Sequence, residues 1–139
     1  SVYTDGSSGF RRGLPGGWAW VLLMADTPIR CGYGGDPSTS NNRMELTAAI
    51  NGMRAALETS TQEWIQLISD SMYVLDIARG HSNPVANLDL ADALRQIFVT
   101  HGGDCRLSTR WVRGHSGDPW NERVDRLAKM GKRSVSDER

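Results

Sequence analysis

The sequence has few cysteines, no net charge and no long apolar run, and each shortage excludes a class of protein. Cys31 and Cys105 are the only cysteines among 139 residues, and their spacing fits neither a metal knuckle nor a redox pair. They predict reduced, half-buried strand residues in a cytoplasmic protein. No apolar run approaches the roughly 18 residues of a membrane span, so we expect no membrane partner. The charges of sixteen basic and sixteen acidic residues cancel, so no global positive field indicates a nucleic-acid partner. Balanced totals do not exclude local patches of positive charge.

The chain length and the absence of repeats or linkers predict one domain. Residues 1–131 would form it around a single core. The polar end of the chain, "GKRSVSDER", contains no apolar stripe. We therefore expect residues 132–139 to be a disordered tail.

The spacing of apolar residues predicts three strands followed by alternating helices and strands. The expected strands lie at 1–4, 17–26, 28–35, 63–69 and 105–114, and the expected helices begin near 42, 71, 90 and 119. Gly80 and the Asp118-Pro119 pair are a typical helix end and a typical helix start. The order predicts an α/β protein with a mixed sheet, helices on both faces and sites at strand ends.

Four acidic residues stand where these elements meet. Asp5 follows the first strand, Asp70 follows the strand at 63–69, Glu45 opens a helix and Asp125 lies in the last helix. Each of them also has an ordinary structural interpretation. Asp5 could be a turn residue and Asp70 a cap of the next helix. Glu45 could be a capping-box residue in "NRME", and Asp125 could be a surface residue. Taken singly, none of them indicates catalysis.

Considered together, the four carboxylates indicate a metal site. If the first strand pairs with the strand at 63–69, Asp5 and Asp70 lie about 4.8 Å apart on adjacent strands. Clustered carboxylates repel one another, and oxygen-only ligands favour Mg²⁺ or Mn²⁺. Two such ions about 3.5–4 Å apart could clamp a phosphodiester.

The motifs "YTDGS", "NNRMELTAAI", "SDSMYV" and "WVRGHSGDPWNERVDRLAK" resemble the type 1 ribonuclease H family in order and spacing. The resemblance covers nearly the whole chain. It implies the ribonuclease H-like fold, a five-stranded mixed sheet with strand order 3-2-1-4-5. It also implies hydrolysis of the RNA strand of an RNA–DNA hybrid, leaving 5′-phosphate and 3′-hydroxyl ends.

By the same resemblance, Asp5, Glu45, Asp70 and Asp125 match the family's four catalytic carboxylates. Asp5 would bridge two Mg²⁺ ions, for which Mn²⁺ could substitute. Asp70 would lie on the side of the attacking water and Asp125 on the leaving-group side. Glu45 would bind metal and contact the 2′-hydroxyl, and His115 matches a mobile histidine that moves a proton or assists product release.

The resemblance also implies substrate contacts. Asn41 and Asn42 match minor-groove asparagines, and Asn42 could also cap the helix. Ser40 matches a residue that grips a phosphate of the DNA strand. Gly6, with Ser7 after it, would let the backbone approach the substrate. His81 and His101 match nothing in the family and are expected to face solvent.

The chain departs from the family at three places. Arg11 and Arg12 replace the usual Asn-Pro-Gly loop, where they either contact phosphates or are simply solvated. Met72 stands where a polar groove-contacting side chain is frequent. Between Gly80 and Leu90 only a short loop replaces the family's basic protrusion, which predicts modest affinity unless other residues (Arg79, Arg110, Arg113) or a missing domain compensate.

Three functions therefore stay open. The first is an active, metal-dependent ribonuclease H, as a monomer or as one domain of a larger polypeptide. The second is a non-catalytic module that binds hybrid or duplex. The third is another nuclease built on the same fold.

Overall fold

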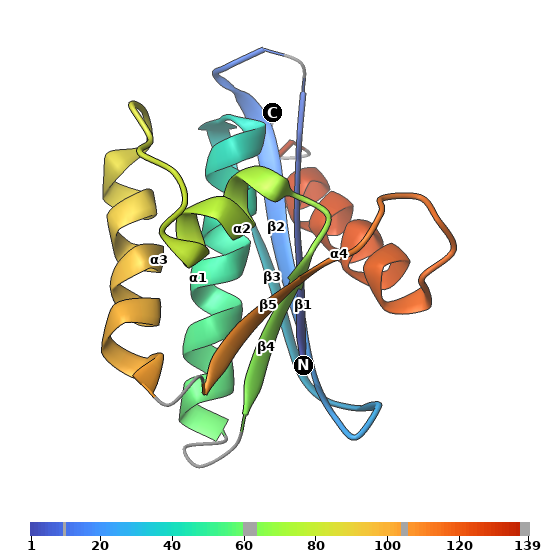
Figure 1. Ribbon diagram of the computed structural model, residues 1–139. Coiled ribbons are helices and arrows are strands. Elements are labelled where there is room, and N and C mark those ends of the chain that lie inside the picture. Colours follow the sequence, from blue (N-terminus) through green and yellow to red (C-terminus); the bar gives the residue numbers. More distant parts are fainter. Residues whose placement is uncertain (10, 60–63, 104–105, 137–139) are drawn as a thin grey trace.

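The computed structural model describes residues 1–9, 11–59, 64–103 and 106–136. The strands are β1 (Val2–Ser8), β2 (Leu14–Met24), β3 (Thr27–Thr39), β4 (Ile65–Ser69) and β5 (Leu107–Trp111), and the helices are α1 (Asn41–Thr59), α2 (Met72–Arg79), α3 (Leu88–His101) and α4 (Pro119–Ser136). The strands form one sheet in the order β3-β2-β1-β4-β5 (Figure 1). The expected fold class and strand order are confirmed.

The sheet is mixed because its first three strands form hairpins and its last two follow crossovers. β1 pairs antiparallel with β2, and β2 pairs antiparallel with β3. β1 and β4 are parallel, as are β4 and β5. The carboxyl ends of β1 and β4 therefore meet at one edge of the sheet, which is where sheets of this kind place their sites.

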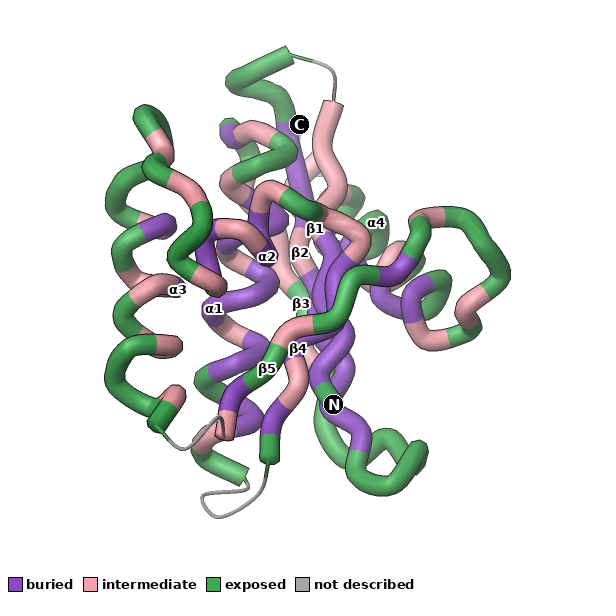
Figure 2. Tube along the Cα trace, viewed as in Figure 1, coloured by how far each residue is buried: buried purple, intermediate pink, exposed green. Residues whose placement is uncertain are grey.

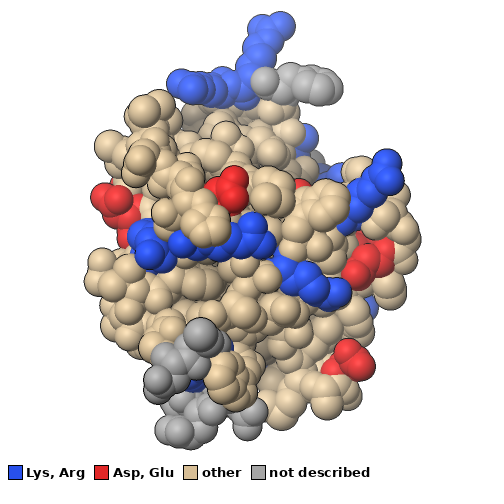
Figure 3. All heavy atoms as spheres, viewed as in Figure 1, with Lys and Arg blue, Asp and Glu red and all other residues tan. Residues whose placement is uncertain are grey.

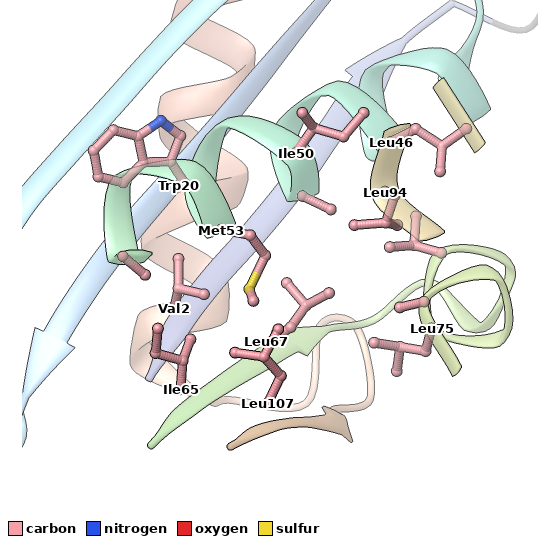
Figure 4. Close-up of a cluster of buried hydrophobic side chains, with 14 of the residues drawn as sticks. Val2, Trp20, Leu46, Ile50, Met53, Ile65, Leu67, Leu75, Leu94 and Leu107 are labelled. Carbon is pink, nitrogen blue, oxygen red and sulfur yellow. The ribbon is translucent and has the colours of Figure 1, made fainter. Parts of the chain in front are cut away.

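Helices cover both faces of the sheet. α1, α2 and α3 lie on one face and α4 lies alone on the other (Figure 1). β1 alternates between the two cores, with Val2 packed toward α1 and Tyr3 packed toward α4. Buried residues accordingly run along the central strands and the helix sides that face them (Figure 2). The larger core contains, among others, Val2, Trp20, Leu46, Ile50, Met53, Leu67 and Leu94 (Figure 4).

Two predicted helix boundaries are confirmed. Gly80 ends α2 with a left-handed backbone at φ +76°, and its N–H donates to the carbonyl groups of Asp76 and Ile77. Asp118 caps α4, because its Oδ1 accepts from the backbone N–H groups of Trp120 at 3.0 Å and Asn121 at 3.1 Å. This cap places the start of α4 beside the edge of the sheet where β1 and β4 end.

The structure differs from the expectations at the two ends of the chain. β1 continues to Ser8 instead of ending at residue 4, so Asp5 lies inside the strand. α4 continues to Ser136, so the expected disorder is wrong for residues 132–136, and residues 137–139 lie outside the described residues. The helix continues because Gly131 is buried against the sheet.

The remaining expectations concern cysteine, histidine and the membrane. Cys31 is on β3 and exposed, so its predicted half-burial is wrong, and Cys105 lies outside the described residues. His81 and His101 are exposed, as expected. None of the helices in the described part of the chain combines the length and the apolar character that crossing a bilayer requires.

Candidate active site

Two aspartates meet where β1 and β4 run side by side. The parallel register pairs Tyr3 with Ile68. Two residues further along each chain, Asp5 therefore comes opposite Asp70. Asp5 is only 5% exposed within β1, which excludes the turn role. Ser71, not Asp70, caps α2, so the capping role of Asp70 is excluded as well.

Glu45 reaches the same place from the second turn of α1. The cap of α1 is Ser40, whose Oγ accepts from the backbone N–H of Arg43 at 3.3 Å. The capping-box interpretation of Glu45 and the capping role of Asn42 are therefore wrong. Instead, Glu45 is 5% exposed and its Oε1 accepts from the backbone N–H of Gly6.

Gly6 allows α1 to approach β1 closely. A Cβ atom at this position would lie 2.6 Å from the carbonyl carbon of Met44 and 2.9 Å from its Cβ. Any larger residue would push the start of α1 away from the strand, and Glu45 would move with it. This packing role differs from the substrate role expected for Gly6, which stays a prediction.

Asp5, Glu45 and Asp70 form one carboxylate cluster. One oxygen atom from each lies within 4.8 Å of the others. Burial, and next the negative charge of Glu45, raises the pKa of Asp5. Burial is also the largest cause of the raised pKa values of Glu45 and Asp70. Such a cluster needs a proton or a cation to offset its repulsion, and its all-oxygen donor set suits a hard divalent cation.

Asp125 lies beside this cluster but is not one of its members. It projects from α4 and pairs with Lys129, whose Nζ is 3.0 Å from its Oδ2. Its side chain is 25% exposed. Its charge nevertheless raises the pKa values of both Asp5 and Asp70. The structure therefore gathers three of the four expected ligands and leaves the fourth nearby, held by a lysine.

His115 lies on the loop that leads into α4. It is exposed and has a left-handed backbone with φ +55°, and Gly117 follows at φ +92°. A Cβ atom on Gly114 would lie 2.9 Å from Asp70 Oδ2, so the loop passes directly beside that carboxylate. A positive charge on His115 lowers the pKa of Asp70, opposing the effect of burial. The loop thus presents an exposed histidine close to the cluster.

A groove with a volume of about 660 Å³ runs past the start of α1. Its lining includes four residues singled out from the sequence, namely Arg12, Ser40, Asn41 and Asn42. Residues 83–87 of the short loop before α3 also line it. The loop that replaces the basic protrusion is therefore part of the lining of this groove.

The other expected substrate residues lie outside the residues that line the groove. Arg11 is exposed, Ser7 is half-buried in β1 and Met72 is 44% exposed at the start of α2. Of the arginines that could compensate for the missing protrusion, Arg79 donates to Thr109 Oγ1 at 2.6 Å and Arg110 donates to the Tyr3 hydroxyl at 3.0 Å. Figure 3 shows Lys and Arg atoms in a row across the middle of one face of the molecule.

Two residues that the sequence interpretation missed contact the carboxylates. Asn121 is 4% exposed and hydrogen-bonds to Asp70, while its own Oδ1 has no partner within the described residues. Ser71 hydrogen-bonds to Glu45. Asn121 could have been found by helical spacing, since it lies four residues before Asp125 and interrupts the apolar stripe of α4. No comparable signal marks Ser71.

Comparisons with known proteins agree with this geometry. A family model described as RNase H matches residues 1–133. The chain is 42% identical over 144 residues to ribonuclease HI of Pseudomonas aeruginosa, covering 94% of this chain and 90% of the relative. A ribonuclease H1 from compost, solved in complex with an RNA/DNA hybrid, has a TM-score of 0.80 at 16% identity and 97% coverage of both chains. The N-terminal RNase H domain of a Mycobacterium tuberculosis protein has a TM-score of 0.79 at 21% identity, covering 99% of this chain and 96% of that one. These last two similarities show a shared fold.

Proposed function

Because the chain belongs to the ribonuclease H family, we propose that it hydrolyses the RNA strand of RNA–DNA hybrids with two divalent metal ions. The products would carry 5′-phosphate and 3′-hydroxyl ends. The observation that supports this most is the cluster of buried Asp5 and Glu45 with half-buried Asp70, whose oxygen atoms lie within 4.8 Å of one another. A fold has no structural need for three such carboxylates, because their burial and repulsion are unfavourable.

The donor set fits the proposed ions. All three side chains offer oxygen only, which favours Mg²⁺ with Mn²⁺ as a substitute. Bound divalent ions would supply charge neutralisation, an activated water and stabilisation of the leaving oxygen. Asp5, Glu45 and Asp70 would hold them. Asp125 would give up its ion pair with Lys129 and bind metal as well. Asn121 would orient Asp70 through their hydrogen bond.

Selection of a hybrid would depend on the groove beside α1. Asn41 and Asn42 are exposed there and can hydrogen-bond to sugars or base edges without a sequence requirement. Ser40 lies in the same groove and would contact a phosphate of the DNA strand. Arg12, also in the groove, and Arg11 would contact backbone phosphates. Glu45 would contact the 2′-hydroxyl next to the scissile phosphate, which is the group that distinguishes RNA from DNA.

His115 would move a proton or assist product release. It is exposed on a loop that passes directly beside Asp70, so it can approach the reacting atoms without disturbing the core. An imidazole is suited to proton transfer near neutral pH. Its side chain is free to change position, which a step in product release requires.

Cleavage assays separate the three functions that the sequence left open. Labelled hybrid, matched duplex DNA, duplex RNA and single strands are each incubated with Mg²⁺, Mn²⁺ or a chelator. The proposal expects cleavage of the hybrid alone, only with metal, and loss of cleavage in Asp5→Asn but not in the exposed control Asp92→Asn. Binding of the hybrid without cleavage would indicate the non-catalytic module, and cleavage of duplex DNA would indicate another nuclease of this fold.

Two further expectations belong to this proposal. The enzyme would act as a monomer or as one domain of a larger polypeptide, which sedimentation of the natural gene product can distinguish. A cytoplasmic location is expected because the two cysteines have no spacing that indicates a disulfide framework. Fractionation of cells that make the protein tests this location.

A further inference from the structure

Helix α4 carries a net positive charge, although the whole chain has no net charge. Its 18 residues include five basic and two acidic side chains, a net charge of +3, whereas the whole chain sums to zero. The metal site needs only one side of this helix, where Asp125 and Asn121 lie. Most of the positive charge is therefore not explained by the site.

Four of the five basic residues of α4 lie on the side opposite its buried stripe, and the fifth, Lys132, is half-buried. Residues of a helix follow one another by about 100°, which groups the exposed residues Arg123, Arg126, Met130 and Arg133 within one arc. The buried residues Val124, Ala128 and Gly131 occupy the arc that faces the sheet. Figure 1 shows α4 alone on its side of the sheet, with no other helix over its outer face. We name the residues Arg123, Arg126, Leu127, Lys129, Met130 and Arg133 the outer face of α4.

The outer face forms a cationic groove. These six residues alone line a hollow of about 430 Å³. Within the described residues, Lys129 pairs with Asp125, whereas none of the three arginines forms an ion pair with a carboxylate. Met130 is 41% exposed in the middle of the groove. Unpaired guanidinium groups in a row attract a polyanion.

We propose that the outer face of α4 binds the phosphate backbone of nucleic acid outside the cleaved segment. The proposal rests on the proposed function, because it assumes that the ligand continues as a duplex beyond the active site. Arg123 and Arg133 are ten residues apart, which corresponds to about 15 Å along the helix. A strand with a rise of about 3.4 Å per nucleotide offers roughly four phosphates over that length.

The geometry favours a nucleic acid over an acidic protein segment. The apolar part of the outer face consists of one exposed methionine and the half-buried Leu127, which is little for a protein interface core. Arginine binds phosphate oxygens with two parallel hydrogen bonds. A duplex already held at the carboxylates would present its flanking phosphates at high local concentration, so weak contacts would suffice.

The test measures binding separately from cleavage. Arg123→Gln with Arg126→Gln removes two positive charges from the outer face. Arg54→Glu, at an exposed position on α1 across the sheet, changes the net charge by the same amount and is the matched control. All proteins carry Asp70→Asn to prevent cleavage, and melting temperatures confirm that each is folded. Fluorescence anisotropy then gives the affinity for hybrids of about 10 and about 30 base pairs across a salt series.

We expect the double variant to bind the longer hybrid about tenfold more weakly, and its salt slope to be shallower by about 2, as the loss of two phosphate contacts predicts. The loss should be smaller for the shorter hybrid and absent in Arg54→Glu. An unchanged slope, or an equal loss in the control, overturns the proposal. The proposal is also overturned if the salt slope is unchanged while poly-glutamate binds the protein with the unsubstituted outer face but not the double variant. The outer face would then bind an acidic protein. Cleavage by the otherwise unsubstituted chain is measured separately, so failure of the proposed function is recognised independently.

Discussion

Replacing Asp70 with asparagine should abolish cleavage, retain hybrid binding and stabilise the metal-free protein. The carboxylate oxygens of Asp5, Glu45 and Asp70 lie within 4.8 Å of one another. Burial and the charge of Glu45 raise the pKa of Asp5, so Asp5 is the member that keeps a proton most readily. The charged pair that remains, Glu45 and Asp70, repels by about 3 kcal/mol at this separation with an effective dielectric constant of about 20.

The expected gain is smaller than this repulsion because Asp70 is half-buried and water screens part of its charge. We expect about 1 to 3 kcal/mol, which corresponds to roughly 3 to 10 °C in the melting temperature of a domain of this size. Asparagine has nearly the shape of aspartate and can keep the hydrogen bond with Asn121. The substitution therefore removes a charge without opening a cavity.

The same reasoning gives a pH dependence for the metal-free protein. The pKa values of Asp5, Glu45 and Asp70 are all raised by folding. Their contribution to stability is complete below the unfolded-state values near pH 4 and is lost as the pH rises through the raised values. The melting temperature in chelator should fall with rising pH over that window. It should fall less steeply in Asp70→Asn.

Calorimetry in chelator, at several pH values, measures these effects, with Asp92→Asn as a control at an exposed position of α3. Adding Mg²⁺ should raise the melting temperature of the unsubstituted protein more than that of Asp70→Asn, because the variant has lost a ligand. A melting temperature that drops by several degrees in Asp70→Asn, while Asp92→Asn is unchanged, would refute the reasoning. Asp70 would then stabilise the fold through its hydrogen bonds.

Three other substitutions test the surroundings of the site. His115→Ala should lower kcat by about 10²-fold in hybrid cleavage without changing the melting temperature, since the side chain is exposed. Tyr3→Phe removes the hydroxyl that donates to Asp118 Oδ2 at 3.2 Å, so calorimetry should show a loss of about 1 kcal/mol. Gly131→Ala places a Cβ 2.7 Å from the carbonyl carbon of Gly34, and denaturant unfolding should show a loss of about 1–3 kcal/mol. An unchanged kcat in His115→Ala contradicts the role of His115, and an unchanged stability in Tyr3→Phe or Gly131→Ala contradicts the corresponding contact.

The sheet could be predicted from the sequence because its hydrophobic pattern is local. The apolar run of β4 and the alternation along β5 give strand type, whereas the order of the strands comes from the resemblance to the ribonuclease H family. The convergence of Asp5 and Asp70 follows from the parallel pairing of these two strands. The contact between Gly6 and Glu45 could not be predicted in the same way, because it depends on how closely α1 approaches the sheet.

The wrong prediction of a disordered tail shows that sequence composition cannot reveal contacts between distant segments. The segment from Gly131 onward is polar and rich in charge, and composition alone assigns such a segment to solvent. Its helix is held because Gly131 lies against the backbone of Gly34 and Gly35 in β3. A Cβ on Gly131 or Gly35 would collide with backbone across this contact, and a Cβ on Gly34 would collide with the Trp18 side chain. Glycine usually weakens a helix or a strand, yet these three glycines form one close contact between segments far apart in the sequence. We expect this contact, with that of Gly17 against Ala128, to set how closely α4 packs on the sheet and therefore how far Asp125 lies from the carboxylates. Packing near the end of α4 would thus contribute to the geometry of the site.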